Sequence, residues 1–226
     1  MSVWAVIVAA GSGTRMGLAV NKALAPLVGK TVLERSLEAF EGLVDGAVVV
    51  YRTQDEQAVR ALNLRARLAR GGETRQDSVL SGLRALPEDA EIVLVHDAAR
   101  PFVRRETIAA CIESVRKYGS GVAAVPVTDT IKRAEPSGLV LDTPDRSALY
   151  AVQTPQGFRA DLIRKAHEFA QADGYLGTDD ASLLEHAGLP VYLCEGSREN
   201  LKLTTPTDLK LAEIILAARL QQEEDV

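Results

Sequence analysis

The sequence predicts an α/β fold in which a mostly parallel sheet is covered by helices on both faces. Short apolar runs without strict alternation recur along the chain, and segments with helical spacing of apolar residues lie between them. Strands of this kind, separated by helices, are typical of parallel sheets that are buried on both faces. A length of 226 residues is within reach of one such domain. We therefore expect a single domain over residues 1–226, with a polar, acidic and frayed tail at residues 221–226.

The expected elements alternate in order along the chain. Buried strands are predicted at Val3–Ala9, Ala47–Tyr51, Ile92–Val95, Gly121–Val125 and Val191–Leu193. Helices are predicted at Val32–Phe40, Ser78–Leu86, Glu106–Tyr118 and Leu162–Ala172. Sheets of this class bind ligands beyond the carboxyl ends of their strands, so the segments that follow each strand are the candidates for a site.

Residues 126–155 break this alternation. They contain three turn clusters and no helical period, and extended pieces at Ile131–Arg133, Leu139–Leu141 and Leu149–Val152 can pair around the turn Pro136–Gly138. An arm that exposes Leu139–Leu141 needs cover, and a second subunit is the obvious source. The sequence therefore predicts a protruding β-arm that forms a homodimer, and the alternative is an arm folded on its own domain.

The composition excludes several classes of protein. An ordinary apolar content of 46% argues against disorder and collagen, and a formal net charge of 26 − 31 = −5 argues against a general nucleic-acid binder. The longest apolar run, Val3–Ala10, is far short of a membrane span, and the N-terminus does not have the pattern of a signal peptide. Cys111 and Cys194 lie far apart in the sequence, which suits a reducing cytoplasm.

A glycine-rich loop, A-G-S-G-T-R-M-G at residues 10–17, follows the first strand. Its glycines allow a ligand to approach the backbone amides, which can form an anion-binding nest. A dinucleotide fingerprint requires glycine where Met16 stands, and a Walker loop ending in Gly-Lys-Thr requires glycine where Leu24 stands. Arg15 and Lys22 place two cations beside the loop, as stabilisation of charge growing on phosphorus requires. The alternative is a tight turn with solvated basic residues.

Three further segments supply candidate residues. H-D-A-A-R-P directly follows the third strand, so Asp97 is placed where a ligand or Mg²⁺ should lie, although a turn acid is the alternative. The turn that begins at Gly72 opens a helix near Ser78, where a simple cap is the alternative. Lys202 lies on an extended segment before the last helix. The histidines show no metal-binding spacing, and no G-x-S-x-G motif of a serine hydrolase occurs.

Five motifs occur together in the order of a known family. They are A-A-G-x-G-x-R-M-G, H-D-A-A-R-P, P-V-x-D-T-x-K, T-P-Q and N-x-K-x-T-x-P, and they extend over roughly Val3 to Leu216. Each motif is weak alone, whereas the ordered set is specific. The chain resembles the 2-C-methyl-D-erythritol 4-phosphate cytidylyltransferases of the non-mevalonate isoprenoid pathway.

The resemblance implies a Rossmann-like nucleotidyltransferase fold with an extended arm that builds a cytoplasmic homodimer. It implies a reaction in which CTP and methylerythritol phosphate give the CDP-alcohol and pyrophosphate with the help of Mg²⁺. Because the arm is exchanged, its residues would serve the active site of the partner subunit.

The resemblance also implies roles for individual residues. Contacts with the cytidine nucleotide fall on Ala9, Ala10, Gly11, Gly13, Gly72 and Ser78. Charge at the α-phosphorus would be stabilised by Arg15 and Lys22. Mg²⁺, the sugar of CTP and the second substrate would lie beside Asp97 and Arg100. The methylerythritol phosphate would be held by Arg146 and Lys202, with Thr130 and Thr154 nearby.

One visible departure from the family lies beside the loop lysine. The usual P-K-Q is Asn21-Lys22-Ala23 here, which keeps the charge and changes its surroundings. One alternative function is a cytidylyltransferase for another alcohol phosphate, such as ribitol 5-phosphate, and Ala98-Ala99 weakly favours the methylerythritol enzyme. The other alternative is a non-catalytic nucleotide-binding regulator, against which the retained cations argue.

Overall fold

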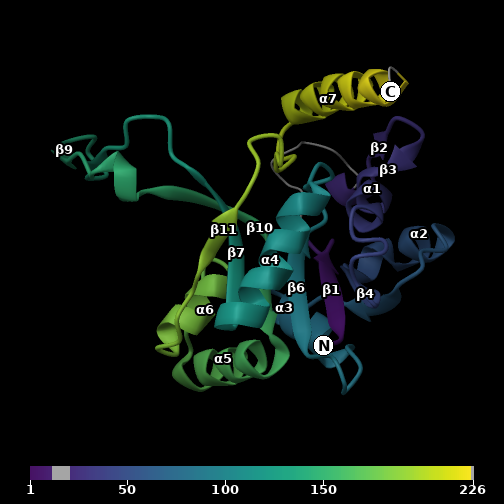
Figure 1. Cartoon of the computed structure of the whole chain (residues 1–226), viewed down its shortest axis with the longest axis horizontal. Coiled ribbons are helices and arrows are strands. Elements are labelled where there is room, and N and C mark those ends of the chain that lie inside the picture. The colour runs from purple at the N-terminus through teal and green to yellow at the C-terminus, as the bar shows by residue number, and fades with distance from the viewer. Residues whose placement is uncertain (12–20, 225–226) are drawn as a thin grey trace.

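The computed structural model describes residues 1–11 and 21–224. This part of the chain contains a large mixed β-sheet. In this part the sheet has seven strands in the order β11-β7-β10-β6-β1-β4-β5 (Figure 1). Only β10 runs antiparallel to its neighbours in it, so the predicted mostly parallel sheet is confirmed. The sheet strands are β1 (Val3–Val8), β4 (Gly46–Tyr51), β5 (Arg67–Arg70), β6 (Ile92–Asp97), β7 (Ser120–Pro126), β10 (Tyr150–Arg159) and β11 (Leu193–Glu195).

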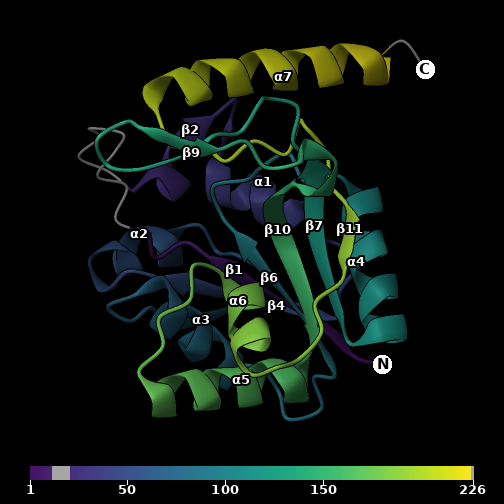
Figure 2. The ribbon, with the colours of Figure 1, turned by 90° about the vertical axis from the view of Figure 1, so that its left-hand side faces the viewer.

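Helices cover both faces of the sheet, as the sequence predicts (Figure 2). Leu33 and Ile108 join the side chains of one face, whereas Leu83 and Ile163 join those of the other. The helices are α1 (Val32–Glu38), α2 (Glu56–Ala61), α3 (Arg75–Arg84), α4 (Arg105–Tyr118), α5 (Ala160–Asp173), α6 (Asp180–His186) and α7 (Pro206–Glu224). Three short 3₁₀ turns in the described residues are η2 (Lys22–Leu24), η3 (Thr53–Asp55) and η4 (Arg146–Ala148). In the same ranges, two small antiparallel hairpins are formed by β2 (Pro26–Leu27) with β3 (Lys30–Thr31) and by β8 (Arg133–Ala134) with β9 (Val140–Asp142).

Strands β10 and β5 differ most from the sequence prediction. Only Leu149–Val152 is expected to be extended, yet β10 continues to Arg159 between β6 and β7. Its middle carries polar side chains and Pro155, which lies where pairing with β7 is interrupted between Val152 and Gln156. Proline at an irregularity is compatible with a strand, although it hides the strand in the sequence. Strand β5 has the sequence R-L-A-R, which lacks an apolar run.

The arm is the hairpin that projects from the body between β7 and β10 (Figure 1). Gly138, at φ +89°, makes its turn, in a backbone region that favours glycine. Leu139, Val140 and Leu141 are 63%, 50% and 52% exposed. The predicted arm, 126–155, differs from this hairpin at its second boundary, because Tyr150 already pairs with Pro126 in the central sheet.

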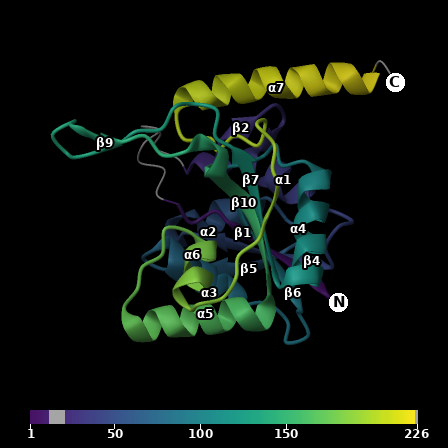
Figure 3. The ribbon, with the colours of Figure 1, turned by 60° about the vertical axis from the view of Figure 1, so that its left-hand side comes forward.

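Helix α7 lies across the end of the molecule that carries the β2–β3 hairpin (Figure 3). Ala212 and Leu216 are buried in a small cluster with Leu27 and Phe102. The helix continues to Glu224, into the segment predicted to be a frayed tail. Within the described ranges, no helix is both long and apolar enough to cross a membrane.

Candidate active site

A pocket of about 350 Å³ opens beyond the carboxyl ends of β1 and β6. This is the edge at which the sequence places the ligand site, because parallel strands present their carboxyl ends together there. Eight of the predicted site residues line it: Ala9, Ala10, Gly11, Lys22, Gly72, Ser78, Asp97 and Lys202. The other lining residues are Val8, Asn21, Ala23, Glu73, Thr74, Arg75, Ala98, Ala99 and Thr204.

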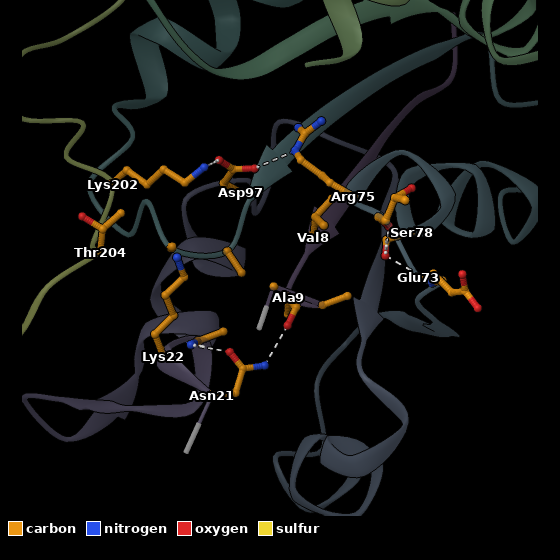
Figure 4. A pocket seen from close by; sticks show the side chains of 17 residues that line it. Val8, Ala9, Asn21, Lys22, Glu73, Arg75, Ser78, Asp97, Lys202 and Thr204 are labelled. Carbon is orange, nitrogen blue, oxygen red and sulfur yellow. Dashed lines mark hydrogen bonds and ion pairs between the residues drawn. The ribbon is translucent and has the colours of Figure 1, made fainter. Parts of the chain in front are cut away.

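Asp97, the last residue of β6, lies between two cations (Figure 4). Its carboxylate oxygens lie 2.6 Å from Lys202 Nζ and 3.5 Å from Arg75 Nε. Burial alone would raise the pKa of Asp97, but the positive charges of Arg75 and Lys202 outweigh it and hold the pKa well below its usual range. Asp97 is therefore anionic at neutral pH and holds both cations at the pocket.

Arg75 is a pocket residue that the sequence analysis missed. It begins α3 and also pairs with Asp180, whose carboxylate lies 2.7 Å from its guanidinium and is almost fully buried. Burial lowers the pKa of Arg75, but the carboxylates of Asp180 and Asp97 raise this pKa by more, so the net shift is upward. Its only sequence signal is its place beside Thr74, the capping residue of a helix that opens after Gly72.

The main chain of Asp97 is fixed from behind by buried polar groups. Its amide donates to Thr154 Oγ1 at 3.1 Å, and this oxygen lies 3.1 Å from His96 Nδ1. His96 Nε2 lies 3.1 Å from the Arg100 carbonyl, which can only accept, so Nε2 carries the proton and Nδ1 accepts from Thr154. Burial lowers the pKa of His96 to about 4 and keeps the ring neutral. Thr154 thus lies beneath Asp97 rather than among the pocket-lining residues.

Arg100 holds the segment that carries Lys202. Its guanidinium donates to the Asn200 carbonyl at 2.6 Å, and the Asn200 side chain donates to the Thr154 carbonyl at 2.8 Å. Burial lowers the pKa of Arg100, and the charge of Asp97 partly opposes this. Arg100 does not line the pocket but supports the Lys202 segment, together with Asn200, which is the first residue of the N-x-K-x-T-x-P motif and to which the sequence assigns no role.

Lys22 reaches the pocket from η2 and rises toward Asp97 and Lys202 (Figure 4). Asn21 caps this turn by accepting from the Ala23 amide at 3.0 Å. Its amide nitrogen donates to the Ala9 carbonyl at 2.8 Å and to Asp55 at 2.7 Å. The departure from P-K-Q thus has a structural account, because buried Asn21 ties the lysine turn to the end of β1.

The wall of the pocket opposite Lys22 is formed by the Gly71–Gly72 turn, which packs closely on the start of α3. Ser78 Oγ donates to the Thr74 carbonyl at 2.9 Å and accepts from the Gly72 amide at 3.2 Å. A Cβ atom added to Gly72 would lie 2.3 Å from the Asp77 Cβ, and one added to Gly71 would lie 2.6 Å from the Ala10 Cβ. Only glycines let this turn pack here, which leaves backbone groups at the pocket surface.

The remaining predicted residues lie elsewhere. Arg146 is at the arm in η4, and its guanidinium donates to the Thr128 carbonyl at 2.6 Å. Thr130 is exposed in the irregular segment between β7 and β8, and neither residue lines the pocket. Gly13 and Arg15 lie outside the residues that the structure describes.

The protein offers one or two carboxylates to a metal at this pocket. Asp97 and Glu73 line it, and the described ranges contain no group of three His, Cys, Asp or Glu residues arranged to hold an ion. Asp97 already faces Lys202 and Arg75. This donor set does not fit an ion held by protein ligands alone, but it fits a Mg²⁺ ion that arrives with phosphate and water ligands.

Comparisons with known proteins agree on one family. A sequence model of the 2-C-methyl-D-erythritol 4-phosphate cytidylyltransferase family matches residues 3–218. The chain is 46% identical over 231 residues to the protein of that name from Geobacillus thermodenitrificans, which covers 98% of this chain and 100% of the relative. It is 47% identical over 223 residues to the one from Symbiobacterium thermophilum, with 96% and 94% covered.

Solved structures give the same result. The crystal structure of 2-C-methyl-D-erythritol 4-phosphate cytidylyltransferase from Thermus thermophilus aligns with a TM-score of 0.83 at 38% identity, covering 95% of this chain and 98% of that one. The 4-diphosphocytidyl-2C-methyl-D-erythritol synthase from Anaerococcus prevotii aligns with a TM-score of 0.85 at 31% identity, covering 96% and 98%. The fold and the sequence therefore point to the same relatives.

Proposed function

Because the chain belongs to the 2-C-methyl-D-erythritol 4-phosphate cytidylyltransferase family, it transfers CMP from CTP to 2-C-methyl-D-erythritol 4-phosphate, and we propose that the pocket beyond β1 and β6 is where it does so. The observation that carries this assignment is the cluster of Lys22, Arg75 and Lys202 around Asp97 at one strand edge. Both substrates are phosphate anions, and such a cluster suits them.

The reaction is an in-line displacement at the α-phosphorus of CTP. An oxygen of the acceptor phosphate forms the new bond as the bond from the α-phosphorus to the bridging oxygen of pyrophosphate breaks. The acceptor phosphate is already an anion at neutral pH, so the reaction needs no strong general base. The difficulty is bringing two anions together and stabilising the charge of the transition state, which positioning and cations supply.

Lys22 and Arg15 are the proposed catalytic cations. Lys22 projects from a turn that Asn21 fixes to β1, which supports a defined position for its ammonium group. The assignment of Arg15 rests on its place in the glycine-rich loop motif. Each would act on charge that is greater in the transition state than in the bound substrates, and so would raise kcat.

The wall that Gly72 and Ser78 form is proposed to hold the cytosine base. Ser78 lies across the pocket from Lys22 (Figure 4), and its hydroxyl accepts from the backbone amide of Gly72, which also lines the pocket. The end of β1 and the loop after it, through Ala9, Ala10, Gly11 and Gly13, would follow the ribose and phosphates. A surface of backbone donors and acceptors suits base recognition because its positions are fixed by the fold.

Mg²⁺ is proposed to join this pocket with the triphosphate of CTP. Asp97 would hold the ion, directly or through water, while Lys202 and Arg75 keep the carboxylate in place. When bound, Mg²⁺ neutralises phosphate charge and orients the leaving group. The contribution of the chain is to keep Asp97 ionised, which its depressed pKa supports.

The acceptor phosphate is proposed to be held by Lys202 together with Arg146 from a second subunit. Arg146 lies on the arm and is not among the residues that line the pocket of its own chain. The exposed Leu139, Val140 and Leu141 of the same arm favour a homodimer in which the arm is covered. Thr130 is assigned to the same side of the site, while Arg100 and Thr154 act there by positioning Lys202 and Asp97. Free cysteines suit the proposed cytoplasmic location.

A pyrophosphate-release assay with CTP, Mg²⁺ and a panel of alcohol phosphates tests this function. We expect release with methylerythritol phosphate and, at equal concentration, at least tenfold less with ribitol 5-phosphate. Equal or greater release with ribitol 5-phosphate would assign the chain to that acceptor instead. No release with any acceptor would contradict the enzymatic function altogether.

A further inference from the structure

Two free thiols that do not line the pocket lie against each other in the core. Cys111 lies in α4 and is fully buried, and Cys194 lies in β11 and is half-buried. Their Sγ atoms are 3.1 Å apart, although 83 positions separate them in the sequence. The chain has two cysteines in all, so each thiol has one possible partner within its own chain.

We propose that Cys111 and Cys194 form a redox-modification site, at which a small disulfide of the glutathione class closes an intrachain bond between α4 and β11. A disulfide has a sulfur–sulfur distance of about 2.05 Å, so the two sulfurs need to approach by only about 1 Å. Helix α4 packs on β7, and β11 pairs with β7 at Cys194↔Ala123. The two elements are therefore already held at the separation that the bond requires.

The surroundings assign different roles to the two thiols. The contact with Cys111 lowers the pKa of Cys194, whereas the same contact, together with burial, raises the pKa of Cys111. Cys194 is also the more accessible of the pair. Because the thiolate is the nucleophile, Cys194 attacks the oxidant, and buried Cys111 reacts second.

The two steps balance without any further reagent. The Cys194 thiolate attacks one sulfur of the oxidant, the sulfur–sulfur bond of the oxidant breaks, and one small thiolate leaves. This thiolate takes the proton of Cys111, whose sulfur then attacks Cys194 and expels the second small thiolate. The protein loses two electrons and two protons, and the oxidant becomes two thiols.

The bond would act on a short edge strand of the sheet. β11 is a three-residue edge strand that pairs with β7 alone, and it leads into the segment that carries Lys202. A covalent link to α4 closes a long loop that contains β7, the arm, β10, α5 and α6. Closing such a loop restricts the unfolded chain, and we expect the melting temperature to rise by about 5–10 °C.

The test equilibrates the reduced full-length protein in buffers of increasing oxidised over reduced glutathione. After quenching, unfolding and alkylation, intact mass gives the number of free thiols. We expect the number of alkylated thiols to fall from two to none, with the loss of two hydrogens from the protein and no glutathione adduct. We expect the melting temperature to rise over the same range of redox ratios. A lasting adduct on Cys194, two free thiols in excess oxidant, or a disulfide-linked dimer on a non-reducing gel would overturn the proposal.

Two serine variants separate the roles of the thiols. Cys111→Ser should stop at a stable mixed disulfide on Cys194, because the resolving thiol is missing. Cys194→Ser should keep Cys111 free and react at least tenfold more slowly with glutathione disulfide, because Cys111 is buried. The reduced melting temperatures of both variants should match that of the wild type, which shows that they fold. Equal reactivity of the two single thiols would overturn the assigned order.

Discussion

Charged side chains at the pocket and in the arm are held in different ways. At the pocket, Arg75 pairs with Asp180, which lies 105 positions away in the sequence. In the arm, Arg133 pairs with Asp142 nine positions away, and Arg146 reaches the Thr128 carbonyl 18 positions away. Distant parts of one chain thus fix the pocket, whereas neighbours in sequence fix the arm. The walls of the pocket therefore come from one chain, whereas the arm projects away from its own pocket and, as proposed above, brings Arg146 to the pocket of a second subunit.

The largest expected effect is on the pocket side of this comparison. Lys22→Ala should lower kcat for pyrophosphate release by about 10²- to 10³-fold, or about 3–4 kcal/mol, because one stabilising charge is lost in the transition state. Lys30→Ala is the matched control, because Lys30 is an exposed lysine that pairs with Glu38. Steady-state kinetics with both substrates saturating measures the effect. A Lys22→Ala enzyme within threefold of the wild type would remove Lys22 from the mechanism.

The burial of neutral His96 behind the pocket should make the stability of the protein depend on pH in the acid range. The pKa of His96 is about 4 in the folded protein and near its ordinary 6.5 when unfolded, so the unfolded chain takes up the proton first as pH falls. The free energy of unfolding should therefore drop between pH 6.5 and 4 by as much as about 3 kcal/mol through this group. Denaturant titrations across that range should show a shallower fall for His96→Gln than for the wild type.

His186→Gln provides the control for that pH series. His186 lies outside the pocket and pairs with Asp173 near the surface. Comparing the two variants at each pH separates a general effect of replacing a histidine by glutamine from an effect specific to buried His96. Identical slopes for His96→Gln and the wild type would show that His96 is not the group that charges on unfolding.

A substitution in the arm should weaken the binding of the acceptor substrate and leave the binding of CTP unchanged. Arg146→Ala should raise the KM for methylerythritol phosphate about tenfold, because one charge-assisted contact with its phosphate is lost, and should change kcat less. Arg133→Ala, which removes an arginine that pairs with Asp142 on the same arm, should leave this KM within about twofold. Equal effects of the two substitutions would mean that the arm acts only through its general charge.

The smallest expected effect concerns the turn that carries Lys22. Asn21→Ala removes the cap of the η2 turn and the hydrogen bond to the Ala9 carbonyl, and it leaves Asp55 with Arg52 as its donor, which should cost about 1 kcal/mol of unfolding free energy. Asn21→Pro restores the usual family residue and loses the same hydrogen bonds, but the φ of −57° at this position suits proline. Chemical denaturation should therefore show a smaller loss for Asn21→Pro. The opposite order would contradict the role given to the Asn21 side chain.

Site residues that lie in motifs are predictable from the sequence, whereas residues whose role depends on partners distant in the sequence are not. Lys22, Asp97 and Lys202 each follow an element in a recognisable pattern, and all three line the pocket. Arg75 has no such signal, and the motif that contains Asn200 does not show its role, because the partners of both residues lie in segments that only the folded chain brings together. The same limit applies to the fold.

Strand β10 shows this limit for a whole element. The strand contains the buried polar residues Gln153, Thr154 and Gln156, and its sequence lacks the apolar run that marks a central strand. Its place follows from the hydrogen bonds that these side chains make, such as Gln156 to Asp179 at 2.8 Å. The five strands predicted from apolar runs all occur, although β11 begins two residues later than expected.

The difference between pocket and arm is tested most directly by mixing two chains that are impaired in different ways. Lys22→Ala lacks a working pocket and Arg146→Ala lacks a working arm, so neither homodimer should turn over normally at low acceptor concentration. If the arm serves the pocket of the partner subunit, a mixture refolded at equal amounts contains one intact site in each heterodimer and should recover about a quarter of wild-type activity. Activity that stays at the mean of the two separate variants would show that each arm serves its own chain, or that no exchange occurs, and would contradict the account.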